Sequence, residues 1–211
     1  MELADRFESK RLEALTLFVQ NSCISSPVWK MALDGIEQVS YQLDDQAFEK
    51  EDVFAGRVAA VAPNILGKRL REALSDASFE RVMEILSLRI SEELEKGVVV
   101  KRFTQLGALK LEKDLRQISE SLLSLVSNSL GVRAIFARLM QLAAVLSVVA
   151  LEEAHDVWDS FVSSSNSSSL KEVTHGKGIR PKDRLNAKEV KRVLALRIDF
   201  DQREIQRMKL L

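Results

Sequence analysis

Apolar residues recur along most of the chain at alternating intervals of three and four positions. The clearest series is Leu111, Leu115, Ile118, Leu122 and Leu125, spaced 4-3-4-3. This spacing places the side chains on one face of an α-helix, and a repeat of about 3.5 residues suits antiparallel packing in a helical bundle. No segment alternates apolar and polar residues over a useful length, as a half-buried strand would. The sequence therefore predicts an all-α fold.

A dense apolar stripe near the C-terminus predicts a helix over Glu189–Phe200. Asn186 is a candidate N-cap, and Glu189 lies three positions later, where a reciprocal capping carboxylate is expected. The predicted core residues of this closing helix are Val190, Val193, Leu194 and Ile198. Because so short a helix is not stable alone in water, we expect it to pack against Ile135–Leu146.

Two interruptions divide the helical pattern. Small and polar residues around Ser129 break it first, and they predict an N-terminal helical bundle over residues 1–129 and a small C-terminal bundle over residues 130–211. The run Ser163–Ser169 and the polar segment that follows predict a disordered loop near residues 163–184. The sequence assigns no role to this loop.

Arg138 lies within the apolar stripe of its own helix, three residues after Ile135 and four before Leu142. A long basic side chain in such a position often packs its stem and leaves its charged end in water. Alternatively, Arg138 forms a partly buried ion pair with Glu189, or with Asp199 as a second candidate. Glu189 also has local alternatives, since it can cap its own helix or pair with Arg192.

Composition narrows the possible functions. Lys plus Arg and Asp plus Glu both number 31, so the net charge of +0 gives no electrostatic argument for nucleic-acid binding. A single Cys23 excludes an internal disulfide and is consistent with a reducing compartment. The most apolar run, Leu139–Leu151, is shorter than the roughly 20 residues of a membrane span. We expect a soluble protein.

The sequence offers no residues for catalysis, a metal or a cofactor. His155 and His175 are the only histidines, and neither has the spacing of a zinc site with Cys23. The segment His175–Gly178 lacks the spacing of a phosphate-binding loop. No pair of carboxylates lies in an apolar setting that suits acid–base chemistry. We therefore expect a non-enzymatic interaction protein.

Six blocks, in the same order, resemble the fourth subunit of the conserved oligomeric Golgi complex. They are Glu93–Lys96, Phe103–Leu109, Glu112–Arg116, Phe136–Leu146, Val190–Phe200 and Glu204–Leu210. The resemblance covers about Glu51 to Leu211 and is weak over residues 1–50. Arg138 and Glu189 both fall within it, or directly beside one of its blocks.

This resemblance implies an elongated rod of stacked helical bundles, in a subunit that tethers vesicles during retrograde intra-Golgi transport. It implies partnership with the other subunits of the complex and with the fusion machinery, and peripheral association with the cytoplasmic face of the Golgi membrane. Chains of the family are several times longer, so this sequence is expected to correspond to their C-terminal part, as a fragment or a short form. The alternative is a free-standing helical adaptor that binds a partner helix.

Overall fold

The computed structural model describes residues 2–49, 53–61, 68–165 and 184–209, and within these ranges the regular structure is helical, which confirms the all-α prediction. The only strand-like features there are isolated bridges at Tyr41, Phe103 and Arg197. The helices are α1 (Glu2–Phe18), the π-helix η1 (Val19–Ile24), α2 (Pro27–Gln38), α3 (Asp45–Phe48), α4 (Val53–Val61), α5 (Lys68–Ala73), α6 (Asp76–Val99), α7 (Gln105–Leu123), α8 (Ser129–Ser147), α9 (Glu153–Ser165), α10 (Ala187–Leu194) and α11 (Gln202–Arg207).

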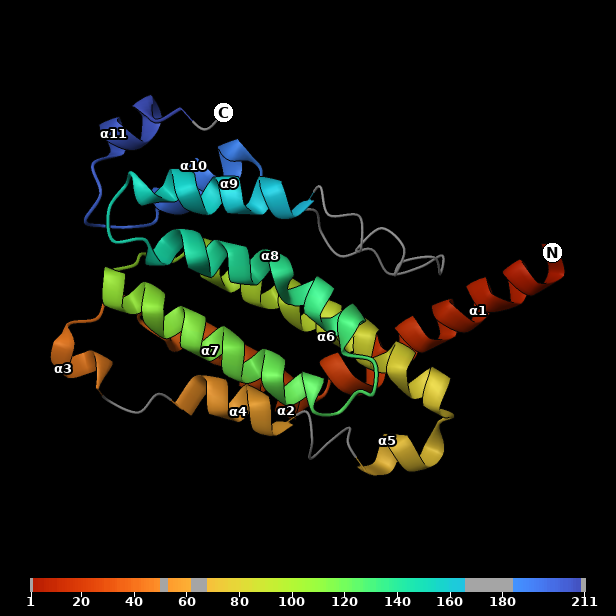
Figure 1. Ribbon diagram of the computed structural model, residues 1–211. Helices are drawn as coiled ribbons and strands as arrows, with labels where there is room; N and C mark the ends of the chain where they lie inside the picture. The colour runs from red at the N-terminus through yellow and green to blue at the C-terminus, as the bar shows by residue number, and fades with distance from the viewer. Residues whose placement is uncertain (1, 50–52, 62–67, 166–183, 210–211) are drawn as a thin grey trace.

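Three long helices, α6, α7 and α8, form the centre of the molecule (Figure 1). Helix α8 packs on both α6 and α7, α4 packs on α7, and α2 packs on α4 and α6. The apolar series predicted for α7 faces this core, since Leu111, Leu115, Ile118 and Leu122 are each 1% exposed. Burial of these side chains is what stabilises helices of this length in water.

Helix α8 is long and apolar enough to cross a membrane by length and composition, and it is the only such helix among the described residues. Half of its most apolar stretch is buried inside the protein. Its residues Ile135, Leu139, Leu142 and Leu146 are all buried, and the helix contacts α6, α7, α9 and α10. These contacts are those of a core helix.

The C-terminal helices cover α8 on the side away from α7 (Figure 1). Helix α10 packs on α8, as expected, and α11 packs on α10. The predicted start of α10 is confirmed. Asn186 and Glu189 form a capping box in which Asn186 Oδ1 accepts from Glu189 N at 3.0 Å and Glu189 Oε2 accepts from Asn186 N at 2.8 Å.

The predicted end of this helix is wrong. Helix α10 ends at Leu194 instead of continuing to Phe200, and Ile198 is 53% exposed, so it is not a core residue of the closing helix. Val190, Val193 and Leu194 are buried. The helix ends because the next residues form other bonds: Ile198 N donates to Phe103 O at 3.0 Å, and the Arg197 side chain turns into the protein.

Residues 163–165, predicted to begin the disordered loop, are helical instead. Helix α9 continues to Ser165, since serine has only a moderate cost in a helix. The remainder of that predicted loop, residues 166–183, lies outside the described residues. The division into two bundles near Ser129 stays a prediction; Ser129 is the first residue of α8, which contacts helices on both sides of that boundary.

Candidate functional site

Three distant segments of the chain meet at one end of the bundle, where Phe103 forms isolated bridges to both Tyr41 and Arg197. Phe103 N donates to Leu196 O at 3.0 Å, and Thr104 N donates to Tyr41 O at 3.1 Å. The Tyr41 and Phe103 rings stack with their centroids 5.1 Å apart. We call this meeting point the loop junction; it joins the α2–α3, α6–α7 and α10–α11 connections.

Thr104 and Gly107 hold the first of these segments in place. The Thr104 hydroxyl accepts from Gly107 N at 3.2 Å, which caps α7, and it donates to Leu43 O at 2.9 Å. At Gly107 the backbone of α7 lies so close to the Tyr41 carbonyl that an added Cβ would overlap that oxygen. The close approach therefore requires glycine.

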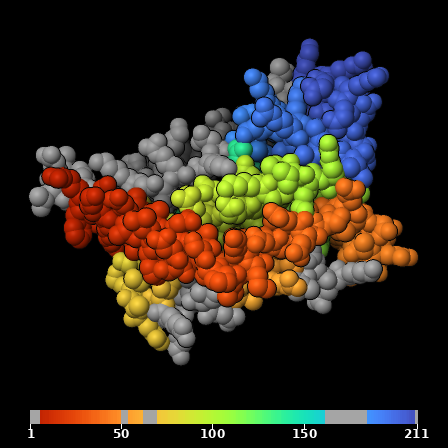
Figure 2. Space-filling model, turned by 180° about the vertical axis from the view of Figure 1, so that it is seen from behind, coloured from red at the N-terminus to blue at the C-terminus, as the bar shows by residue number. Residues whose placement is uncertain are grey.

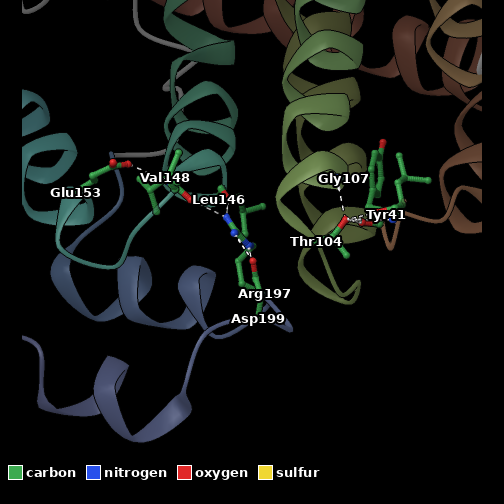
Figure 3. Close-up of polar contacts among 10 residues, drawn as sticks. Tyr41, Thr104, Gly107, Leu146, Val148, Glu153, Arg197 and Asp199 are labelled. Atoms are coloured by element: carbon green, nitrogen blue, oxygen red, sulfur yellow. Dashed lines mark hydrogen bonds and ion pairs between the residues drawn. The ribbon is translucent and has the colours of Figure 1, made fainter. Parts of the chain in front are cut away.

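The Arg197 side chain is 0% exposed, and it joins the α10–α11 connection to the C-terminal end of α8. Its Nη1 donates to the carbonyl oxygens of Leu146 and Val148, the latter at 2.9 Å, where α8 ends (Figure 3). Its Nε and Nη2 donate to the two carboxylate oxygens of Asp199 at 2.8 and 2.6 Å. Carbonyls at the end of a helix have no partners within it, so the guanidinium caps α8 while Asp199 balances its charge.

Arg138 forms a partly buried ionic contact that joins α8 to α6 and α10. Its Nη2 lies 2.6 Å from Glu189 Oε1, and its Nε lies 3.1 Å from Glu95 Oε1. Its side chain is 12% exposed. The structure thus brings together Arg138 and Glu189, the two residues that the sequence paired. Glu95 is a further partner of Arg138 that the sequence did not predict. Asp199, the second candidate partner, binds Arg197 instead.

We expect a double-mutant cycle of Arg138→Met and Glu189→Gln to show a coupling of about 1–2 kcal/mol in the free energy of unfolding. Glutamine keeps the capping acceptor for Asn186 N, so the cycle isolates the ionic contact. Urea denaturation of the four proteins measures it. The exposed Arg116–Glu112 pair within α7, 2.7 Å apart, is the control and is expected to give no more than about 0.5 kcal/mol. Zero coupling would contradict a structural role for the Arg138 contact.

The two ionic contacts also predict a dependence of stability on pH. The hydrogen bond from Arg138 lowers the pKa of Glu189, and the hydrogen bond from Arg197 lowers the pKa of Asp199. A carboxyl group whose pKa is lower in the folded protein stabilises it above the unfolded pKa, about 4, and loses this contribution as pH falls through the folded value.

Melting temperatures between pH 7 and pH 3 test this dependence. We expect the wild-type protein to lose more stability over that range than a Glu189→Gln, Asp199→Asn variant, which lacks both carboxyl groups. An equal loss of stability in the two proteins would show that the carboxyl groups of Glu189 and Asp199 do not cause the pH dependence.

The described residues contain no arrangement typical of catalysis or metal binding. Among them, no group of three or more His, Cys, Asp or Glu side chains is placed to hold a metal ion. The His155 ring lies 3.2 Å from the carboxylate of Asp159 on its own helix, and His175 lies outside the described residues. Burial raises the pKa of Cys23 to about 11, which keeps it a neutral thiol. A surface cavity of about 310 Å³ beside Arg138 is lined by acidic, basic and aliphatic side chains together.

Comparison with known proteins decides the family. A family model described as "Conserved oligomeric Golgi complex subunit 4, C-terminal" matches residues 3–192. The chain belongs to this family. The matched range contains Arg138, Glu95 and Glu189, while Arg197 follows it.

Individual members of the Golgi subunit 4 family match almost the whole chain. The Homo sapiens protein named "Conserved oligomeric Golgi complex subunit 4" is 27% identical over 210 residues, which is 99% of this chain and 24% of that protein. The Arabidopsis thaliana protein of the same name is 26% identical over 188 residues, 88% of this chain and 23% of its own length. The chain therefore spans about a quarter of the length of these relatives.

Sequence reasoning missed Arg197 and Glu95. Arg197 sits between Leu196 and Ile198 in the most apolar stretch of the C-terminal segment, and Asp199 follows two residues later. That pattern, a lone arginine inside an apolar run with a carboxylate nearby, indicates a buried and paired arginine. The sequence around Glu95 contains no comparable pattern that would predict its contact with Arg138.

Proposed function

We propose that this chain is the C-terminal helical module of a non-enzymatic subunit of a Golgi vesicle-tethering complex, acting in retrograde intra-Golgi transport. The match of the family model to residues 3–192 carries the proposal. Relatives from an animal and a plant match most of the chain, so the similarity is not restricted to one motif.

The fold supports a role in binding and positioning. Two arginines, the buried Arg197 and the partly buried Arg138, join helices and loops to one another. Such contacts fix the relative positions of helices, which a module that presents a defined surface to other proteins requires. We propose that its partners are the other subunits of the complex and the membrane fusion machinery, at the cytoplasmic face of the Golgi membrane.

Affinity purification of the tagged chain from cells of its own source tests this function. We expect the other subunits of the Golgi complex to co-purify, and the tagged protein to localise to the Golgi. One dominant small partner in place of the complex would instead indicate a free-standing helical adaptor. The Arg197→Met variant is the matched control, because its loss of structure should remove the co-purifying subunits.

A further inference from the structure

The chain is electrically balanced as a whole, but its C-terminal segment is basic. Residues 184–209 contain eight Lys and Arg residues and four Asp and Glu residues. Two of these carboxylates already bind arginines, since Glu189 contacts Arg138 and Asp199 contacts Arg197. Helices α10 and α11 therefore present an excess of positive charge at the surface. The exposed basic side chains of this segment are those of Lys188, Arg192, Arg203, Arg207 and Lys209.

Exposed aliphatic side chains lie beside this positive charge, where α6 ends. Val99, Val100 and Ile198 are 44%, 79% and 53% exposed. Val99 also lines the same surface cavity as Arg192, so an aliphatic and a basic side chain are neighbours there. Apolar residues that gather on a surface and are bordered by polar ones mark a place where a protein or a membrane binds.

Hydrogen bonds join these residues into one surface. Ile198 N donates to Phe103 O at 3.0 Å, which places the segment after α10 beside the segment after α6. The carbonyl oxygen of Ala195 accepts from Arg102 Nη1 at 2.7 Å and from Gln202 Nε2 at 3.2 Å. It thereby holds the start of α11 at the same place. Figure 2 shows the C-terminal helices, in blue, against the yellow-green end of α6 and start of α7. We call Val99, Val100, Arg102, Arg192, Ile198 and Arg203 the basic end surface.

The backbone directs two of these side chains outward. Phe103 and Arg197 pair in a parallel bridge and are 0% and 1% exposed, so both face the protein. Side chains alternate between the two sides of an extended segment. Arg102 and Ile198 therefore lie on the outer side, and both are exposed.

We propose that the basic end surface binds the anionic phospholipids of a membrane. Basic side chains near a membrane are attracted to anionic headgroups, and exposed aliphatic side chains enter the boundary between headgroups and acyl chains. This inference deepens the proposed function and rests on it for the identity of the membrane, which is that of the Golgi or of a vesicle.

The residue types of this surface favour a membrane over an acidic protein segment. Protein interfaces gain much of their affinity from aromatic side chains that fill pockets, and valine is under-represented among their strongest contacts. The exposed apolar residues of the basic end surface are two valines and one isoleucine. A membrane requires only apolar area and positive charge, and the surface supplies both.

The surface has a boundary on the side of α9. Val149 is 63% exposed where α8 ends, but the exposed Glu152 and Glu153 follow it closely. Carboxylates repel anionic headgroups, so Val149 is not part of the basic end surface.

Flotation of the purified 211-residue chain with lipid vesicles tests the proposal. The vesicles contain phosphatidylcholine alone, or equal amounts of phosphatidylcholine and phosphatidylserine. We expect the chain to bind the mixed vesicles only, and to bind them less as salt is raised. An Arg192→Gln, Arg203→Gln variant should bind the mixed vesicles about tenfold less or weaker still, because it loses two positive charges from the surface.

An Arg57→Gln, Arg133→Gln variant is the matched control for charge. It loses the same two positive charges, but from exposed arginines on α4 and near the start of α8. We expect its binding to the mixed vesicles to fall by no more than about twofold, since distant surface charges are screened by salt. Circular dichroism verifies that each variant keeps the wild-type helix content.

A second pair of variants tests the aliphatic side chains. A Val100→Ser, Ile198→Ser variant should bind the mixed vesicles about threefold less or weaker still, because it buries less apolar area in the membrane. A Val28→Ser, Val149→Ser variant is its control, since these valines are 52% and 63% exposed outside the basic end surface. We expect no loss of binding in this control.

Four results would overturn the proposal. The first is that the chain does not float with the mixed vesicles, and the second is that phosphatidylcholine vesicles bind it equally well. The third is equal binding by the Arg192→Gln, Arg203→Gln variant and its control. The fourth is that a synthetic helix of Glu and Leu binds this surface while neither vesicle does, which would indicate a protein partner. Co-purification of the Golgi subunits is a separate readout, so failure of this proposal and failure of the tethering function are distinguishable.

Discussion

Replacing Arg197 with methionine is expected to lower the free energy of unfolding by about 2–6 kcal/mol, because two buried carbonyl groups lose their hydrogen-bond donor at a cost of about 1–3 kcal/mol each. Methionine preserves most of the packed stem but not the guanidinium. The carbonyls of Leu146 and Val148 then lose their donor at the buried end of α8. Asp199 loses its partner as well. The Phe200 ring, 4.3 Å from the guanidinium carbon, also loses a cation–π contact.

Urea denaturation with a constant m value measures this loss. Arg203→Met is the control, because Arg203 is exposed on the short helix α11; we expect it to change stability by no more than about 0.5 kcal/mol. If the two variants were equally stable, the bonds of Arg197 to the end of α8 would not stabilise the fold. We also expect hydrogen exchange in the Arg197→Met variant to increase first in α10 and α11.

Replacing Gly107 with alanine is expected to cost about 3 kcal/mol, the upper end of the usual cost of overpacking. The added Cβ overlaps the Tyr41 carbonyl oxygen, which is a backbone atom and has no rotamer by which to move away. This overlap is removed only if α7 moves away from the segment that contains Tyr41. That separation breaks the bond of 3.1 Å from Thr104 N to Tyr41 O.

Gly56→Ala is the matched control, since Gly56 lies inside α4 and its nearest neighbour to an added Cβ is Gln117 Nε2 at 3.8 Å. Alanine there should stabilise the protein by about 0.5–1 kcal/mol, because glycine loses more conformational freedom in a helix. Thermal and urea denaturation of both variants should therefore show shifts of opposite sign. A Gly107→Ala protein as stable as wild type would mean that the loop junction is not tightly packed.

The positions of the long helices could be predicted from the sequence because their apolar stripes are long and regular. The apolar series in α7 and α8 can be recognised from the helical period alone. The start of α10 was also predictable, since Asn186 and Glu189 form a local pattern that does not depend on the rest of the fold.

The end of α10 was not predictable in the same way. Ile198 continues the apolar stripe in sequence, yet bonds to Phe103, about ninety residues earlier, take its backbone out of the helix. Arg197 looks like part of a helix face and in fact caps α8. Both outcomes depend on tertiary contacts between distant segments, which override local preference and leave no periodic signal.

We expect this chain to perform the function of the matched C-terminal quarter of its relatives. A chimera of the Homo sapiens protein, with the matched region replaced by this chain, tests it in cells that lack their own subunit 4. The readout is Golgi processing of a secreted glycoprotein, compared with the intact subunit and with a form that lacks the matched region. We predict that the chimera restores processing and that its Arg197→Met form does not. A chimera of normal abundance that restores no more processing than the truncated form would contradict the claim.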